Sequence, residues 1–102
     1  MSLGELIAEL AKHHPGTPVS LGFGNPHSYR GNYESLAFEP VEGTSVGDML
    51  SEAQSALGAT YGGWKGGEYT MRADTEVFLA ERGESGEGIG PTLLRYMTGQ
   101  VG

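Results

Sequence analysis

The chain has 102 residues, 37% hydrophobic and 19% charged, which predicts a single domain over residues 1–102. With 13 acidic residues against 6 Lys and Arg the formal charge is -7, which disfavours binding to a nucleic-acid duplex or an anionic membrane surface. The absence of cysteine excludes disulfides and thiolate metal sites, and no apolar run approaches the roughly 20 residues of a membrane span. We therefore expect a cytoplasmic protein without a cofactor.

A first helix is predicted over 3–13. Ser2 to Glu5 has the S-x-x-E form of a capping box, in which the two side chains satisfy backbone N–H groups at the helix start. Apolar residues then recur at helical spacing on one stripe. Pro15 and Gly16 end the pattern because proline restricts the residue before it and glycine suits a turn.

Two strands are predicted next. Apolar and small residues alternate over 19–23, and a shorter alternation follows at 36–38. The stretch 25–34 between them is rich in turn formers and long polar-tipped side chains, so we expect a long hairpin loop there.

A second helix is predicted over 46–57, capped by Ser45 and closed by Gly58. A glycine-dense aromatic stretch and a third strand near 75–82 follow, and 82–90 indicates a turn. The segment 91–97 begins at a proline, which suits either an edge strand or the first turn of a short helix, and we favour the strand.

The two predicted helices begin alike. Residues 2–9 and 45–52 share the pattern Ser, apolar, Gly, acid, apolar, apolar, small, Glu, and strand-like runs follow each. One interpretation is an α-β-β unit that occurs twice. The other is that two unrelated capped amphipathic helices look the same.

Both interpretations predict an α+β fold with two helices on one face of a mainly antiparallel four-stranded sheet. The opposite face would be open, with the apolar Phe78 on it, so we expect a homo-oligomer. The expected core consists of Leu6, Ile7, Leu10, Val19, Leu21, Phe23, Leu36, Phe38, Met49, Leu50, Ala53, Leu57, Val77 and Leu79.

Five of the nine aromatic residues and three of the six cationic residues lie in the two long loops. Rings that stack on a planar group, beside cations that bind phosphate, favour a nucleotide-like ligand. The predicted ligand-binding residues are His27, Tyr29, Arg30, Tyr33, Trp64, Lys65, Tyr69 and Arg72. The alternative is structural: the rings close the edges of a small sheet, and the cations pair with Glu34, Glu68 or Asp74.

Two further hypotheses belong to other functional classes. His27 could act as a general base oriented by Glu34 or Glu39, which would make the protein a small hydrolase, although no nucleophile motif accompanies it. Carboxylates also recur at spaced positions, either as a solvated face or as a surface that binds and inhibits a host protein; they are Glu39, Glu42, Glu81, Glu84 and Glu87.

Three stretches, 27–33, 36–40 and 64–69, resemble those of small uncharacterised accessory proteins of tailed bacteriophages and prophages. The likeness extends over about residues 18–83. It implies a host-cell setting and names no catalytic residue. Together with the loop residues it suggests a non-enzymatic protein that binds a small phosphorylated ligand, for instance as a host-defence antagonist, with inhibition of a host protein as the alternative.

Overall fold

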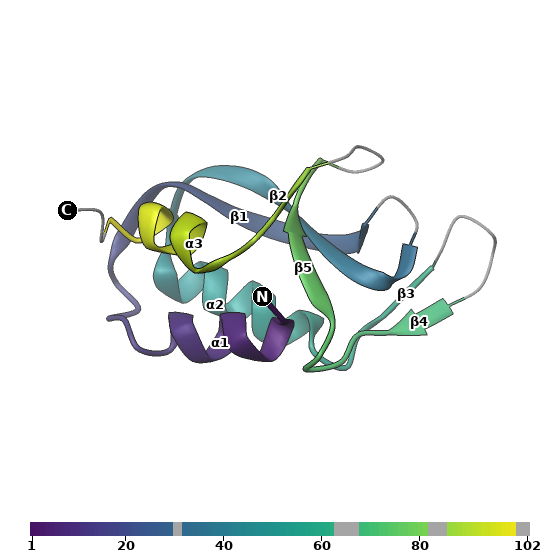
Figure 1. The fold of residues 1–102 in the computed structure, drawn as a ribbon. Helices are drawn as coiled ribbons and strands as arrows, with labels where there is room; N and C mark the ends of the chain where they lie inside the picture. Colours follow the sequence, from purple (N-terminus) through teal and green to yellow (C-terminus); the bar gives the residue numbers. More distant parts are fainter. Residues whose placement is uncertain (30–31, 63–67, 82–85, 100–102) are drawn as a thin grey trace.

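The computed structural model describes residues 1–29, 32–62, 68–81 and 86–99, with the backbone alone at 32–34. Its helices and strands form an α+β fold (Figure 1). In chain order they are α1 (Leu3–Leu10), β1 (Pro18–Tyr29), β2 (Asn32–Ser45), α2 (Val46–Ala56), β3 (Thr60–Gly62), β4 (Glu68–Thr70), β5 (Glu76–Leu79), β6 (Glu87–Gly88) and α3 (Pro91–Met97).

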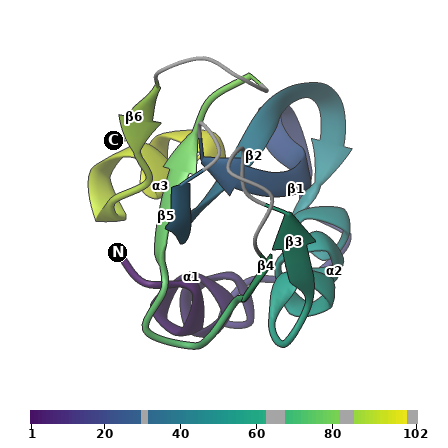
Figure 2. The same ribbon diagram turned by 90° about the vertical axis from the view of Figure 1, so that its right-hand side faces the viewer.

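The strands form two sheets. The larger has the order β1-β2-β5-β6, in which β2 and β5 run parallel and the other two pairs are antiparallel. Strands β3 and β4 pair only with each other. Helices α1 and α2 lie side by side beneath the long β1–β2 hairpin, and α3 lies beside β1 (Figures 1 and 2). Within the described ranges no helix has the length and apolar character needed to cross a membrane.

The segment 91–97 is a helix, so the prediction of an edge strand is wrong. Pro91 occupies the first turn, where its missing N–H leaves no helical hydrogen bond unmade. Leu94 and Met97 are three residues apart and both are buried in the common core. This burial selects the helix over a strand, in which residues three apart would face opposite sides.

The long loop predicted over 25–34 is also wrong, because β1 continues to Tyr29 and β2 begins at Asn32. A β-bulge between Gly24 and His27 places one extra residue in β1. Asn25 adopts a positive φ of 49°, and Pro26 follows it on this edge strand. The turn-forming residues therefore bend a strand instead of ending it.

The two helices with similar starts use their glycines in the same way. The N–H groups of Gly4 and Gly47 each donate across 2.8 Å to a carbonyl of a neighbouring segment, that of Ala73 and that of Pro15. A Cβ at either glycine would lie 3.1 Å or 2.9 Å from the same oxygen. An antiparallel hairpin follows each helix, but β1–β2 and β3–β4 lie in different sheets. The glycine of the shared pattern thus lets a distant segment of the chain approach the start of each helix.

The core is shared by all three helices and the large sheet. Two residues predicted for it are exposed: Leu21 at 48% and Leu57 at 45%. Ile7, Leu50 and Leu79 are only partly buried. The buried hydrophobic residues that the prediction omitted are Leu3, Ala37, Val46, Ala56, Met71, Ala80, Ile89, Leu94 and Met97.

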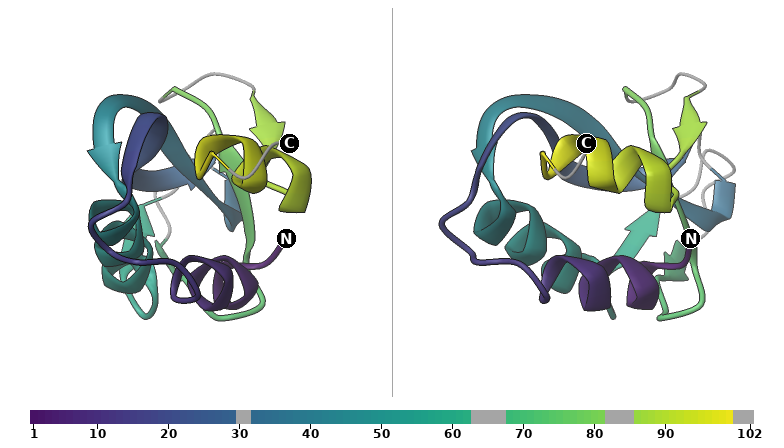
Figure 3. Two further views of the ribbon diagram at one scale, coloured as in Figure 1. Left: turned by 90° about the vertical axis from the view of Figure 1, so that its left-hand side faces the viewer. Right: turned by 60° about the vertical axis from the view of Figure 1, so that its left-hand side comes forward.

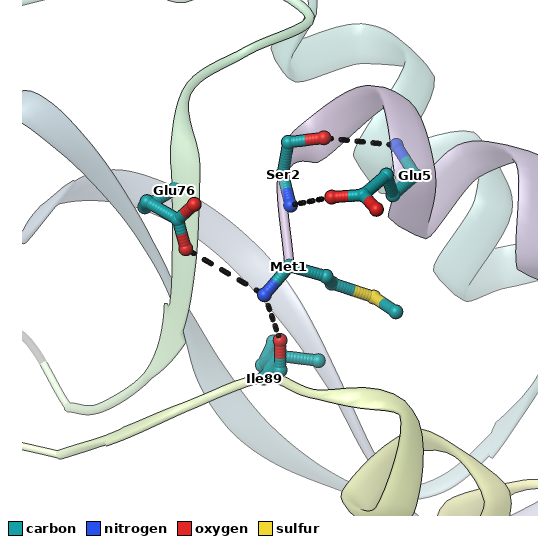
Figure 4. Close-up of polar contacts among 5 residues, drawn as sticks. All are labelled: Met1, Ser2, Glu5, Glu76 and Ile89. Carbon is teal, nitrogen blue, oxygen red and sulfur yellow. Dashed lines mark hydrogen bonds and ion pairs between the residues drawn. The ribbon is translucent and has the colours of Figure 1, made fainter.

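The first residues of the chain join α1 to the sheet (Figure 4). The capping box of Ser2 and Glu5 is formed in both directions, as predicted. The amino group of Met1 donates to the carbonyl of Ile89 across 2.9 Å and lies 3.5 Å from the carboxylate of Glu76. Residues from opposite ends of the sequence therefore meet at the start of α1.

Candidate functional site

His27 lies on β1 directly after the bulge, opposite Ala37 of β2. Its side chain is buried, with 5% of the residue exposed. The ring Nδ1 lies 3.1 Å from the carbonyl oxygen of Asn25, while Nε2 is buried without a hydrogen-bond partner. The predicted orienting residue Glu39 makes no hydrogen bond to this ring, and the side chain of Glu34 lies outside the described residues. A substrate would have to displace neighbouring groups to reach His27.

Tyr29 is packed against the rest of the sheet. Its ring stacks on Phe78 of β5, with centroids 4.1 Å apart and planes 4° from parallel. Its hydroxyl accepts the N–H of Gly86 across 3.1 Å and lies 3.4 Å from the carbonyl of that residue. One face of the ring and the hydroxyl are thus used within the chain, as the structural alternative predicts.

The same contact bears on Phe78, the residue that motivated the expected homo-oligomer. Tyr29 covers it from within the chain, so Phe78 by itself does not call for a second copy. Homo-oligomerisation stays a prediction.

Tyr69 lies on β4, opposite Tyr61 of β3. The guanidinium carbon of Arg72 is 5.9 Å from the centroid of the Tyr69 ring, within the range of a cation–π contact. Arg72 Nε also lies 3.4 Å from a carboxylate oxygen of Asp74, an exposed pair of the kind that contributes little to stability. Arg72 is thus held beside Tyr69 while its side chain stays accessible.

Tyr61 is a partly buried residue of β3. Burial raises the pKa of the Tyr61 phenol, and the nearby Glu52 of α2 raises that pKa further because it opposes a second negative charge. Glu52 of α2 and the β3–β4 hairpin are therefore close in space.

The ends of the two hairpins meet. Ser28 Oγ, near the end of β1, donates to the carbonyl of Gly62 at the end of β3 across 3.4 Å. The two loops that carry the predicted site leave from these adjoining strand ends. Of the predicted residues, Arg30, Trp64 and Lys65 lie outside the described residues, as does the side chain of Tyr33.

Two surface grooves involve residues that the sequence prediction did not single out. One, of about 350 Å³, lies between α2 and the β1–β2 hairpin and carries the carboxylates of Asp48 and Glu52. The other, of about 280 Å³, lies between α1 and α3 and includes Arg95. The sequence gives no sign of the second groove, because one of its walls is the helix at 91–97, a segment that was predicted to be a strand.

No family model, curated protein sequence or solved structure matches this chain.

Proposed function

We propose that this protein is a non-enzymatic binding protein for a small, planar, phosphorylated ligand such as a nucleotide. The ligand would lie where the β1–β2 and β3–β4 hairpins meet. The supporting observation is the contact between Ser28 and Gly62, which brings together the two strand ends that lead into the predicted loops.

The chain length between these strand ends and the predicted residues is short. Arg30 follows Ser28 by two positions, and Lys65 follows Gly62 by three. An extended chain covers roughly 3.3–3.6 Å per residue, so each side chain originates within about 11 Å of the strand-end residue that precedes it. Rings and cations from both loops can therefore reach one ligand, whose phosphates would take the cations and whose ring would stack.

The described residues divide the predicted site into two groups. His27 and Tyr29 are engaged in the fold, which favours a supporting role for both. Tyr69 and Arg72 are paired with each other next to the hairpin end, so they supply a ring and a cation from the β4 side. The ligand contacts thus rest on Arg30, Tyr33, Trp64, Lys65, Tyr69 and Arg72.

The burial of His27 supports a binding role over hydrolysis. A general base must come within hydrogen-bond reach of the proton that it removes, and only 5% of the His27 residue is exposed. The setting implied by the phage resemblance fits a protein that sequesters a nucleotide without converting it.

Calorimetric titration with a panel of linear and cyclic nucleotides tests the proposal. We expect at least one nucleotide to bind, to be recovered unchanged after heat denaturation, and to lose affinity in Trp64→Ala and Arg30→Gln. A lost stacking contact costs about 1–3 kcal/mol, and a lost charge-assisted hydrogen bond costs a similar amount.

Lys12→Gln is the matched control, because it removes one positive charge from an exposed pair with Glu9 at the far end of α1. It should leave nucleotide affinity unchanged. The absence of binding heat with every nucleotide would contradict the proposal, as would equal losses in Lys12→Gln and Arg30→Gln. Recovery of a converted nucleotide would point to the hydrolase.

Inhibition of a host protein through an acidic surface is the second candidate. It is favoured by the open groove between α2 and the β1–β2 hairpin, which carries Asp48 and Glu52 beside polar Asn25 and Thr44. Co-purification of a basic host protein with wild type but not with Asp48→Asn and Glu52→Gln combined would support this candidate.

A further inference from the structure

A groove of about 280 Å³ is lined by residues of α1 and α3. These two helices face each other in Figure 3. The N-terminus of the chain lies between the two helices, and both helices lie away from the hairpin ends discussed above. The apolar part of the groove's lining comes from Met1, Ala8, Pro91 and Leu94, and its charged side chains are Glu5, Glu9 and Arg95.

Arg95 differs from the other cations in the described part of the chain. Among the described residues no carboxylate lies within ion-pair distance of Arg95, whereas the other cations are paired: Lys12 with Glu9, Arg72 with Asp74, and the amino group of Met1 with Glu76. In a chain of formal charge -7, an arginine without a partner beside an apolar groove is available to a ligand anion.

The α1 side of the same groove carries carboxylates. One oxygen of Glu5 accepts the N–H of Ser2, and one oxygen of Glu9 accepts a bond from Lys12. The second oxygen of each carboxylate has no protein partner among the described residues. A ligand ammonium group would find acceptors here.

We propose that this groove binds a free α-amino acid with an apolar side chain, in its zwitterionic form. The ligand carboxylate pairs with Arg95, its ammonium group with Glu5 and Glu9, and its side chain packs against Ala8 and Leu94. A simple anion would be repelled by the two glutamates, and a simple cation by Arg95. A groove of this volume suits a molecule smaller than a typical drug-sized ligand.

This site is separate from the proposed nucleotide site, so either can be present without the other. The probe is L-leucine, compared by calorimetry with leucinamide, which lacks the carboxylate, and N-acetyl-leucine, which lacks the ammonium group. We expect leucine to bind and each derivative to bind at least about tenfold more weakly, because each loses one charge-assisted contact. Equal binding of all three, or no leucine binding at millimolar concentration, would overturn the proposal.

Arg95→Gln tests whether Arg95 binds the ligand carboxylate. Arg95 is exposed, so the variant should fold, and it should weaken leucine binding about tenfold while leaving leucinamide binding unchanged. An equal loss of affinity for leucine and for leucinamide would contradict the assigned role of Arg95.

Ala8→Leu tests the location. Ala8 is an exposed residue of α1 that lines the groove, so the larger side chain fills the groove without entering the core. It should abolish leucine binding, with helix content unchanged by circular dichroism. The matched control Gln54→Leu adds a leucine to an exposed position of α2 and should bind as wild type. Undiminished binding by Ala8→Leu would show that leucine binds elsewhere and would overturn the site.

Discussion

The phenol ring of Tyr29 lies flat against the ring of Phe78, 4.1 Å between centroids, while its hydroxyl accepts the N–H of Gly86. The contact joins the end of β1 to β5, which are not neighbours in the sheet. It turns an aromatic residue that suits a ligand site into part of the fold.

Tyr29→Ala should destabilise the protein by about 2–3 kcal/mol, because a half-buried ring and its stacked contact are both removed. Tyr29→Phe keeps the ring and loses only the hydroxyl contacts to Gly86, so it should cost about 1 kcal/mol. Urea unfolding followed by tryptophan fluorescence measures both. An unchanged midpoint in Tyr29→Ala would mean that the ring is free for a ligand.

Leu10→Ala should destabilise the protein more than Leu50→Ala, although the sequence places both residues on apolar stripes. Leu10 is fully buried, so its truncation leaves a cavity that costs about 2–5 kcal/mol. Leu50 is only partly buried against the core, so Leu50→Ala should lose clearly less stability. Equal losses in urea would contradict the observed orientation of α2.

Gly47→Ala should lower stability by about 1–2 kcal/mol even though alanine is the better helix former. The added Cβ would lie 2.9 Å from the carbonyl oxygen of Pro15, which accepts the N–H of the same residue. The control Ser51→Ala changes an exposed position of the same helix and should be neutral or stabilising. Thermal unfolding of both variants tests the close approach; a stabilised Gly47→Ala would refute it.

The capping box should give stability that depends on pH. Hydrogen bonds from the backbone and side chain of Ser2 lower the pKa of Glu5 from its ordinary value of 4.5, because they favour the carboxylate. A folded-state pKa below that of the unfolded chain stabilises the protein above pH 4.5, and the stabilisation disappears as the pH falls through the folded value. Wild type should therefore exceed Glu5→Gln in urea midpoint at pH 7.

The difference in urea midpoint between wild type and Glu5→Gln should become smaller below pH 4.5. Ser2→Ala should cost about 1 kcal/mol at pH 7 through the lost cap, and it should reduce the pH dependence as well. A difference in urea midpoint between wild type and Glu5→Gln that does not change with pH would contradict this role of the capping box.

Much of the candidate site could be anticipated only as a set of residue types. The sequence places rings and cations in two stretches, and the contact of Ser28 with Gly62 depends on how β1 and β3 approach in space. Tyr29 could not be distinguished from a ligand-stacking ring, because its partners Phe78 and Gly86 are far along the chain.

The amino-acid sequence by itself determined what depends on neighbouring residues. The Ser2 and Ser45 caps, the starts of α1 and α2, and the α+β class follow from local hydrogen bonds and from helical or alternating spacing. The tertiary structure alone decided the rest. Whether 91–97 is strand or helix depends on the core that receives Leu94 and Met97, and the parallel pairing of β2 with β5 depends on contacts between distant segments. Local spacing carries no information about such partners, so the groove between α1 and α3 appears only once the chain has folded.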